Sequence, residues 1–278
     1  MFDGSIENPA ALIGLLAAAA LTLVWGSAEL LRAARGPHAS TLLGGYGVGL
    51  LAGVWLLVPL NVLNLKLGGA LSVIFSAEGN DTGLVELVTN LQWLACAAFC
   101  GLIARARTGW MRWVFAAGAV AALVILGEEI SWGQWLWRWE SPEVFAQHNL
   151  QKETNLHNFA PPEAYDVLYR LVGWAIIAAT LALRYLRAPA RLPLGGELAG
   201  WINRTRLGLP LALTAGTLLQ HPAFQELSEA ALSGAGAHAL AFVLLRMGPR
   251  PAPAWETILP FTRRPGEAAV NDFRRGAA

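Results

Sequence analysis

The chain has 278 residues, of which 55% are hydrophobic and 14% are charged, and its mean hydropathy is +0.45. These values lie outside the averages for soluble domains and predict an integral membrane protein. The net charge is +1 and the arginines are spread over separate short segments, which argues against nucleic acid as a partner.

The first apolar run, Ala10–Leu31, differs from a cleavable signal peptide. No basic residue precedes it, and it is too long for the apolar core of such a peptide. Positive charge follows it, at Arg32 and Arg35. This pattern predicts a retained helix with its N-terminus outside the cytoplasm.

Apolar segments long enough to cross a hydrocarbon core of about 30 Å, which takes ~20 helical residues, recur along the chain. We therefore predict an all-α bundle of about seven transmembrane helices within residues 1–247. The predicted spans are Ala10–Leu31, Thr41–Leu65, Gly83–Ala104, Gly109–Trp135, Ala164–Leu186, Leu207–Phe224 and Ser228–Met247. The last two contain prolines or many small residues and are predicted to form a closely packed hairpin.

The basic residues indicate the topology independently of the apolar runs. Sixteen of the twenty fall on one side of this layout, and the exceptions are Lys66, Arg138, Lys152 and Arg170. By the positive-inside rule the side with sixteen is cytoplasmic, so we predict an N-terminus outside and a C-terminus inside. We expect a bacterial inner-membrane protein surrounded by lipid, with residues 248–278 as a disordered cytoplasmic tail.

The most polar stretch, residues 127–158, follows the fourth predicted span. It opens with Glu128 and Glu129, about 28 Å along that span, where carboxylates are costly. Four tryptophans follow and are typical of an aromatic belt at the outer interface. Asn149, Glu153 and His157 then recur at a spacing of four, which is one face of a helix if this segment is helical.

The other acids and imidazoles of the bundle are predicted to lie near this stretch. Glu86 falls at the outer end of the third span, and His221 lies about 21 Å along the sixth. Such a convergence predicts a polar site that faces away from the cytoplasm. The plain alternatives are that Glu128 and Glu129 cap helices, and that His221 satisfies a frayed helix end.

Carboxylate and imidazole together suit zinc, iron or manganese. We therefore predict Glu129, Glu153, His157 and His221 as candidate metal ligands, with a divalent metal as the implied cofactor. Glu128 or Glu86 is the candidate general base for a metal-activated water.

The sequences GEEISWGQ and NLQKETNLHN, separated by a Ser-Pro-Glu turn, resemble those of a family of uncharacterised bacterial multi-pass membrane proteins. The resemblance covers about the middle third of the chain and implies no particular activity. A fainter resemblance links EGNDTGLVELVTNLQWL, at residues 78–94, to the alkaline ceramidases, which are seven-span zinc-dependent lipid amide hydrolases. That superfamily uses a late His-x-x-x-His pair, which this chain lacks, so only Glu86 and the number of spans carry over.

Three functions are compatible with these patterns. The first is a metal-dependent intramembrane hydrolase of a lipid or amphiphile that enters from the outer leaflet. The second is a non-catalytic subunit or assembly factor of a larger membrane complex, with the polar loop as its binding element. The third is a proton-coupled transporter, against which the inner halves of the spans lack ionisable groups and no inverted repeat is visible.

Overall fold

The computed structural model describes residues 38–67, 70–71, 73–75, 83–137, 139–186 and 193–247. The predicted first span, Ala10–Leu31, and the predicted tail, 248–278, lie outside these ranges. Every described element is helical, and all the helices belong to the unit that ends at Arg246. The all-α prediction is therefore confirmed for the described part of the chain.

Five described helices are long and apolar enough to cross a membrane. They are α2 (His38–Lys66), α3 (Leu84–Ala106), α4 (Gly109–Glu129), α7 (Pro162–Tyr185) and α10 (Gln225–Arg246). With 21 to 29 residues each, they match the ~20 residues that a hydrocarbon core requires. These helices correspond to the second, third, fourth, fifth and seventh predicted spans.

The sixth predicted span, Leu207–Phe224, forms a shorter helix than expected. Here α9 (Gly208–Leu218) has 11 residues, about 16 Å, and a turn links it to the 3-10 helix η4 (Pro222–Phe224). Most side chains of α9 are buried against other helices. Before it, the amphipathic helix α8 (Pro193–Arg204) connects α7 to α9.

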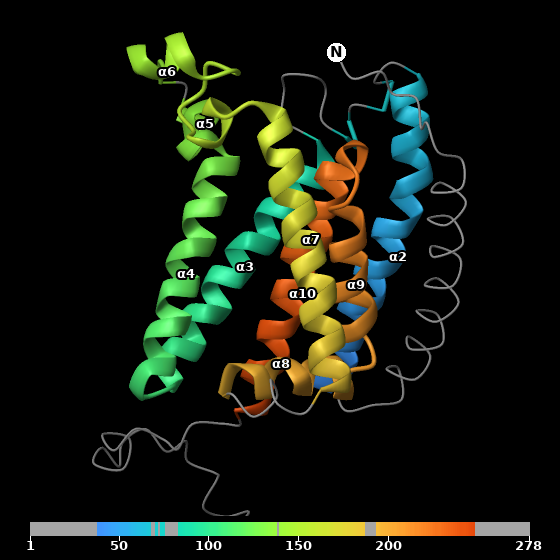
Figure 1. Cartoon of the computed structure of the whole chain (residues 1–278). Helices are drawn as coiled ribbons and strands as arrows, with labels where there is room; N and C mark the ends of the chain where they lie inside the picture. Colours follow the sequence, from blue (N-terminus) through green and yellow to red (C-terminus); the bar gives the residue numbers. More distant parts are fainter. Residues whose placement is uncertain are drawn as a thin grey trace, which may run out of the picture. The chain divides into compact units, whose positions relative to one another are not determined.

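Helix α10 is the centre of the packing, and it lies against α2, α3, α8 and α9 (Figure 1). Leu227 of α10 and Val58 of α2 are fully buried in its apolar core. Polar side chains also link the helices: Ser233 donates to Gln92 at 2.7 Å, and Trp201 donates to His238 at 2.8 Å. Such interhelical bonds stabilise helix pairs where no water is present.

Helix α4 ends earlier than predicted, at Glu129 instead of Trp135. After Ile130, the residues Ser131, Trp132 and Gly133 have φ angles of 46°, 55° and 83°. Because this left-handed region is incompatible with a continuing α-helix, the chain turns here into η1 (Ser131–Gly133) and the short α5 (Gln134–Trp137). Further on lie α6 (Glu143–His148) and η2 (His157–Phe159).

The two ends of the bundle differ in charge. We call one the basic end, made of the α3–α4 turn, the end of α7, α8 and the end of α10 (Figure 1). An ion pair between Arg107 and Glu197 joins the α3–α4 turn to α8 there. The other is the polar-loop end, where α4 and α7 are joined by the segment 130–161.

Candidate functional site

The turn after α4 is built around the ring of Trp132. A Cβ atom added to Gly127 would come within 2.9 Å of that ring, so glycine is required for the indole to lie against the helix. The indole nitrogen of Trp132 then donates to the Glu128 carboxylate at 2.8 Å. The left-handed turn therefore folds Trp132 back onto the last turn of α4.

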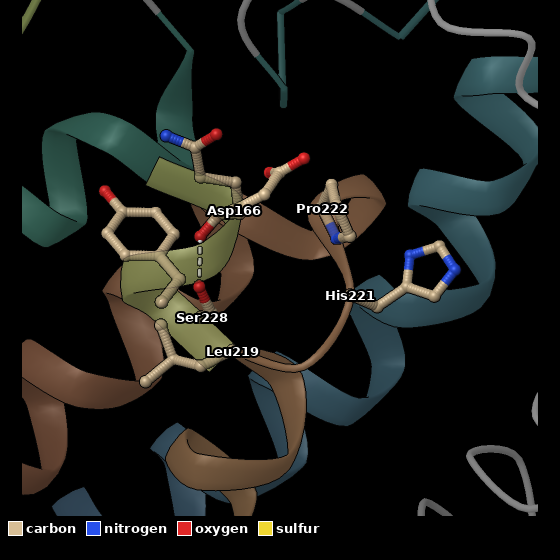
Figure 2. A pocket seen from close by; sticks show the side chains of 7 residues that line it. Asp166, Leu219, His221, Pro222 and Ser228 are labelled. Carbon is tan, nitrogen blue, oxygen red and sulfur yellow. Dashed lines mark hydrogen bonds between the residues drawn. The ribbon is translucent and has the colours of Figure 1, made fainter. Parts of the chain in front are cut away.

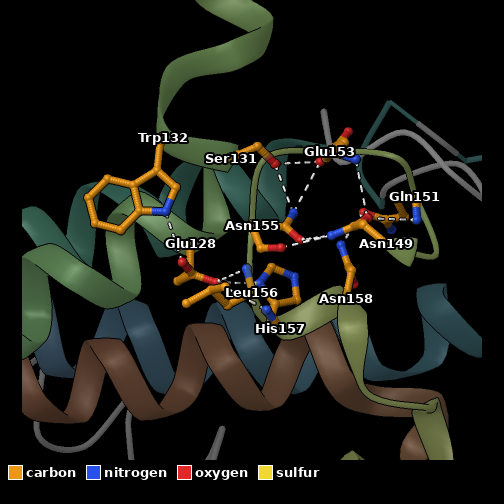
Figure 3. Close-up of polar contacts among 10 residues, drawn as sticks. All are labelled: Glu128, Ser131, Trp132, Asn149, Gln151, Glu153, Asn155, Leu156, His157 and Asn158. Atoms are coloured by element: carbon orange, nitrogen blue, oxygen red, sulfur yellow. Dashed lines mark hydrogen bonds and ion pairs between the residues drawn. The ribbon is translucent and has the colours of Figure 1, made fainter. Parts of the chain in front are cut away.

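The Glu128 carboxylate also holds the far end of the loop (Figure 3). One of its oxygens accepts hydrogen bonds from the backbone nitrogens of Leu156, at 2.5 Å, and His157, at 3.1 Å. The same oxygen lies 3.6 Å from Nδ1 of His157. That nitrogen is buried without a hydrogen-bond partner, although the His157 side chain as a whole is 35% exposed. The structure thus brings two predicted site residues, Glu128 and His157, into one carboxylate–imidazole pair.

A second group of bonds joins Ser131, Glu153 and Asn155. The Ser131 hydroxyl donates to the Glu153 carboxylate. The Asn155 amide donates to the Ser131 hydroxyl at 2.9 Å and to Glu153 at 3.3 Å. Ser131 and Asn155 are almost completely buried, with 2% and 1% of their surfaces exposed. Glu153 is therefore engaged by a hydroxyl and an amide.

The Asn149 side chain forms hydrogen bonds within the loop. Its side-chain oxygen accepts from the backbone nitrogens of Gln151, at 2.9 Å, and Glu153, at 3.2 Å. Its amide nitrogen donates to the side-chain oxygen of Asn155 at 2.8 Å. These local bonds replace helical ones, as Asn side chains commonly do in turns.

Gln134 ties the same loop to α5. Its carbonyl oxygen accepts from the backbone nitrogen of Thr154 at 2.7 Å, and its amide donates to the Ser141 hydroxyl at 2.8 Å. Together with the preceding bonds this forms what we call the motif network, whose members are Glu128, Ser131, Trp132, Gln134, Asn149, Glu153, Asn155 and His157. The residues of the two sequence motifs are therefore hydrogen-bonded to each other in one network.

The expectation that Asn149, Glu153 and His157 share a helix face is wrong. Residues 149–156 form turns, with Lys152 at φ 59°, and only His157–Phe159 is a single 3-10 turn. Asn149 instead bonds the loop backbone, while Glu153 and His157 turn to different partners on the α4 side.

Two further predicted site residues, Glu129 and Glu86, are not part of the motif network. Glu129 is within electrostatic range of Tyr169, whose hydroxyl donates to Glu229 of α10 at 2.8 Å. Glu86 lies half-buried in the first turn of α3. Their roles as metal ligand and general base stay predictions. The Tyr169–Glu229 bond is not predicted by the sequence patterns, which single out carboxylates and imidazoles.

His221 precedes η4 and caps it. Its Nδ1 accepts from the backbone nitrogen of Ala223 at 3.2 Å. It borders a shallow indentation lined also by Asp166, Tyr169 and Gln225, and Figure 2 shows its ring directed away from Asp166. The structure therefore shows His221 in the plain role, as a side chain that satisfies a helix end.

Among the described residues, no three His, Cys, Asp or Glu side chains are grouped so that they could hold a metal ion. The predicted set of Glu129, Glu153, His157 and His221 is therefore not assembled in this arrangement. Within the motif network, Glu128 and His157 bring one carboxylate and one imidazole within 3.6 Å of each other.

His221 is expected to make the protein less stable in acid. Burial lowers the pKa of its imidazole, the Arg170 guanidinium lowers it further, and the Asp166 carboxylate opposes the shift. A histidine whose pKa is lower in the folded state favours unfolding once protonated, so stability present above about pH 6.5 is lost as the pH falls. In His221→Asn, which keeps a capping acceptor, the thermal unfolding temperature should fall less steeply between neutral and mildly acidic pH.

The control for this experiment is His148→Asn, in the exposed part of α6. The unfolding temperature of this variant should equal that of the parent protein at every pH. If the unfolding temperatures of the parent and of His221→Asn fall in parallel as the pH is lowered, His221 is not the source of the acid sensitivity.

Comparisons with protein-family models, with curated proteins and with solved structures found no match to this chain. The resemblances noted in the two motifs and in residues 78–94 remain predictions. The functional argument therefore rests on the geometry of the motif network.

Proposed function

We propose that the chain is a membrane-embedded protein that acts on the polar part of an amphiphile at its polar-loop end, with Glu128 and His157 as an acid–base pair. The observation that carries the proposal is the approach of the His157 imidazole to within 3.6 Å of the Glu128 carboxylate, while most of the surrounding polar groups bond to each other. A group left partly exposed in an otherwise satisfied network is the one available for chemistry.

The positive-inside rule supports an extracytoplasmic site. The arginines of the basic end belong on the cytoplasmic side, which directs the polar-loop end outward. In this orientation Trp132, with 48% of its surface exposed, lies at the outer interface beside the pair. An outer-leaflet lipid or other amphiphile would present its headgroup at this level.

The pair suits hydrolysis of an ester or amide. The backbone donors and the indole hold the Glu128 carboxylate in place, and this carboxylate lies 3.6 Å from Nδ1 of the His157 imidazole. The other nitrogen of His157 would remove a proton from the attacking water as the new C–O bond forms. It would then deliver that proton to the leaving oxygen or nitrogen as the scissile bond breaks.

The involvement of a metal is a separate question. A divalent zinc, iron or manganese ion at this point would take Glu128 and His157 as ligands and would lower the pKa of a bound water. Metal analysis of the purified protein decides between metal-assisted hydrolysis and an acid–base pair that works without metal. Stoichiometric metal that is lost in His157→Ala supports metal-assisted hydrolysis, and metal-free active protein supports the acid–base pair alone.

The hydrolase proposal is tested by reconstituting the full chain in lipid and presenting ester-linked and amide-linked fluorescent lipids. Because general acid–base catalysis contributes about 100-fold or more, His157→Gln and Glu128→Gln should each reduce turnover by at least that factor. His148→Gln, a solvated histidine nine residues earlier, should leave it unchanged. Absence of turnover by the parent protein, or equal activity in His157→Gln, would count against an enzyme.

A non-catalytic binding role is the second candidate, and the exposed apolar residues of the loop favour it. Val144, Leu150 and Leu156 each expose at least 60% of their surfaces on this hydrogen-bonded loop. A rigid loop with exposed leucines is suited to contact with another membrane protein. A stable partner that copurifies after mild solubilisation, and that is lost in Leu150→Ser/Leu156→Ser but kept in His157→Gln, would identify this role.

A further inference from the structure

The basic end carries a large excess of positive charge. Within the described residues it contains seven arginines and one carboxylate, Glu197. The arginines are Arg105, Arg107, Arg112, Arg184, Arg204, Arg206 and Arg246. All of them except Arg107 are exposed.

Glu197, the one carboxylate among the described residues of this end, is already engaged. Glu197 of α8 pairs with Arg107 of the α3–α4 turn, and both side chains are partly shielded, at 21% and 32% exposure. This ion pair fixes α8 beside the turn. The other six arginines are exposed, so the described residues of this end keep a net positive charge.

Helix α8 has the form of a helix that lies along a membrane surface. Trp201 and Ile202 are buried against the bundle, while Asn203 and Arg204 face outward. A Cβ atom added to Gly200 would come within 3.0 Å of the Arg246 guanidinium, so the end of α10 lies directly against α8. An amphipathic helix held in this way places its one cation, Arg204, at the depth of lipid headgroups.

The α3–α4 turn presents cations and tryptophans together. Trp110 and Trp113 are 56% and 71% exposed, and the Arg112 guanidinium lies 5.8 Å from the centre of the Trp113 ring. Exposed tryptophans prefer the interface between hydrocarbon and water, where lipid phosphates also lie. The turn therefore holds its arginines at the level of those phosphates.

We propose that the basic end binds the phosphate headgroups of anionic phospholipids, with α8 and the α3–α4 turn as the two sides of the binding surface. The excess charge supplies the attraction, and guanidinium groups match the geometry of phosphate oxygens. Zwitterionic lipids carry a compensating cation and bind less tightly. The inference is independent of any activity at Glu128 and His157.

The test measures binding of phosphatidylglycerol and of phosphatidylcholine to the full chain in neutral detergent, by native mass spectrometry and by the shift in unfolding temperature. Phosphatidylglycerol should bind more tightly, should raise the unfolding temperature, and should be displaced by salt. Each arginine near the surface contributes about 1 kcal/mol, so Arg204→Gln and Arg112→Gln should each weaken binding about fivefold.

Arg170→Gln is the matched control, because Arg170 is exposed in α7 far from the basic end. It should bind phosphatidylglycerol as the parent does, and Arg204→Lys should bind better than Arg204→Gln. The two test positions lie on separate elements, so a folding defect in one leaves the other informative. Equal binding of the two lipids, or equal loss in Arg170→Gln, overturns the proposal.

Discussion

Replacing Asn155 by alanine is expected to loosen the whole loop between α4 and α7. The Asn155 side chain donates to Ser131 and Glu153 and accepts from Asn149, and only 1% of the residue surface is exposed. Alanine removes all these bonds and leaves buried partners unsatisfied, at a cost of about 3 kcal/mol. Hydrogen exchange of the backbone amides in residues 149–158 should become much faster, and the unfolding temperature should fall.

Asn158→Ala provides a control with the same chemical change. The Asn158 amide makes one hydrogen bond, to Gln151 at 2.6 Å, and that contact is exposed. Its loss should change stability by about 0.5 kcal/mol or less. If the two variants exchange equally fast, the motif network does not hold the loop together.

The long helices could be predicted because lipid imposes a simple rule on their sequences. Runs of about 20 apolar residues bounded by charge determine α2, α3, α4, α7 and α10 to within a few residues at most ends. The end of α4 could not be predicted in this way. Trp132 leaves the helix because its ring packs on Gly127 and its nitrogen bonds Glu128, and neither contact is visible in local composition.

The sequence predicts that Glu128 and His157 lie near each other, and the structure brings these two together. The predicted four-residue metal set is not assembled among the described residues. The carboxylate and imidazole side chains of the second motif predict Glu153 and His157 as metal ligands. In the structure a hydroxyl and an amide engage Glu153, and a carboxylate faces His157. The three Asn and one Gln of NLQKETNLHN are the signal that could have indicated a hydrogen-bonded loop, since buried amides are hydrogen-bonded.

The motif network also has a consequence for the proposed function. A carboxylate and an imidazole act together only if their positions are held to a fraction of an ångström. Glu128 is fixed by Trp132 and by the backbone at Leu156, and the latter bond also places His157. We therefore expect the bonds around Asn155 to matter for turnover as well as for stability, through the position of His157.

A second large loss of stability is expected where α7 meets α9. A Cβ atom at Gly173 would lie 2.7 Å from the carbonyl oxygen of Gly216 and 3.0 Å from Cβ of Leu219, and one at Gly216 would lie 2.7 Å from Ile177. Helix α7 packs mainly on α9 and α8, so this crossing is its principal attachment to the bundle. Small residues permit such a close approach of helices in lipid.

Gly173→Val should therefore force α7 away from α9 and destabilise the protein by about 3 kcal/mol. The Gln220 side-chain amide is the nearest obstacle and can rotate aside, but the backbone oxygen of Gly216 cannot. The unfolding temperature in detergent measures the effect. Gly101→Val in α3 is the matched control, since a Cβ atom there meets nothing within 4 Å and the residue is already partly exposed. If both variants unfold at the same temperature, α7 is held by contacts other than the glycine crossing, and the loop it shares with α4 is the first place to search for them.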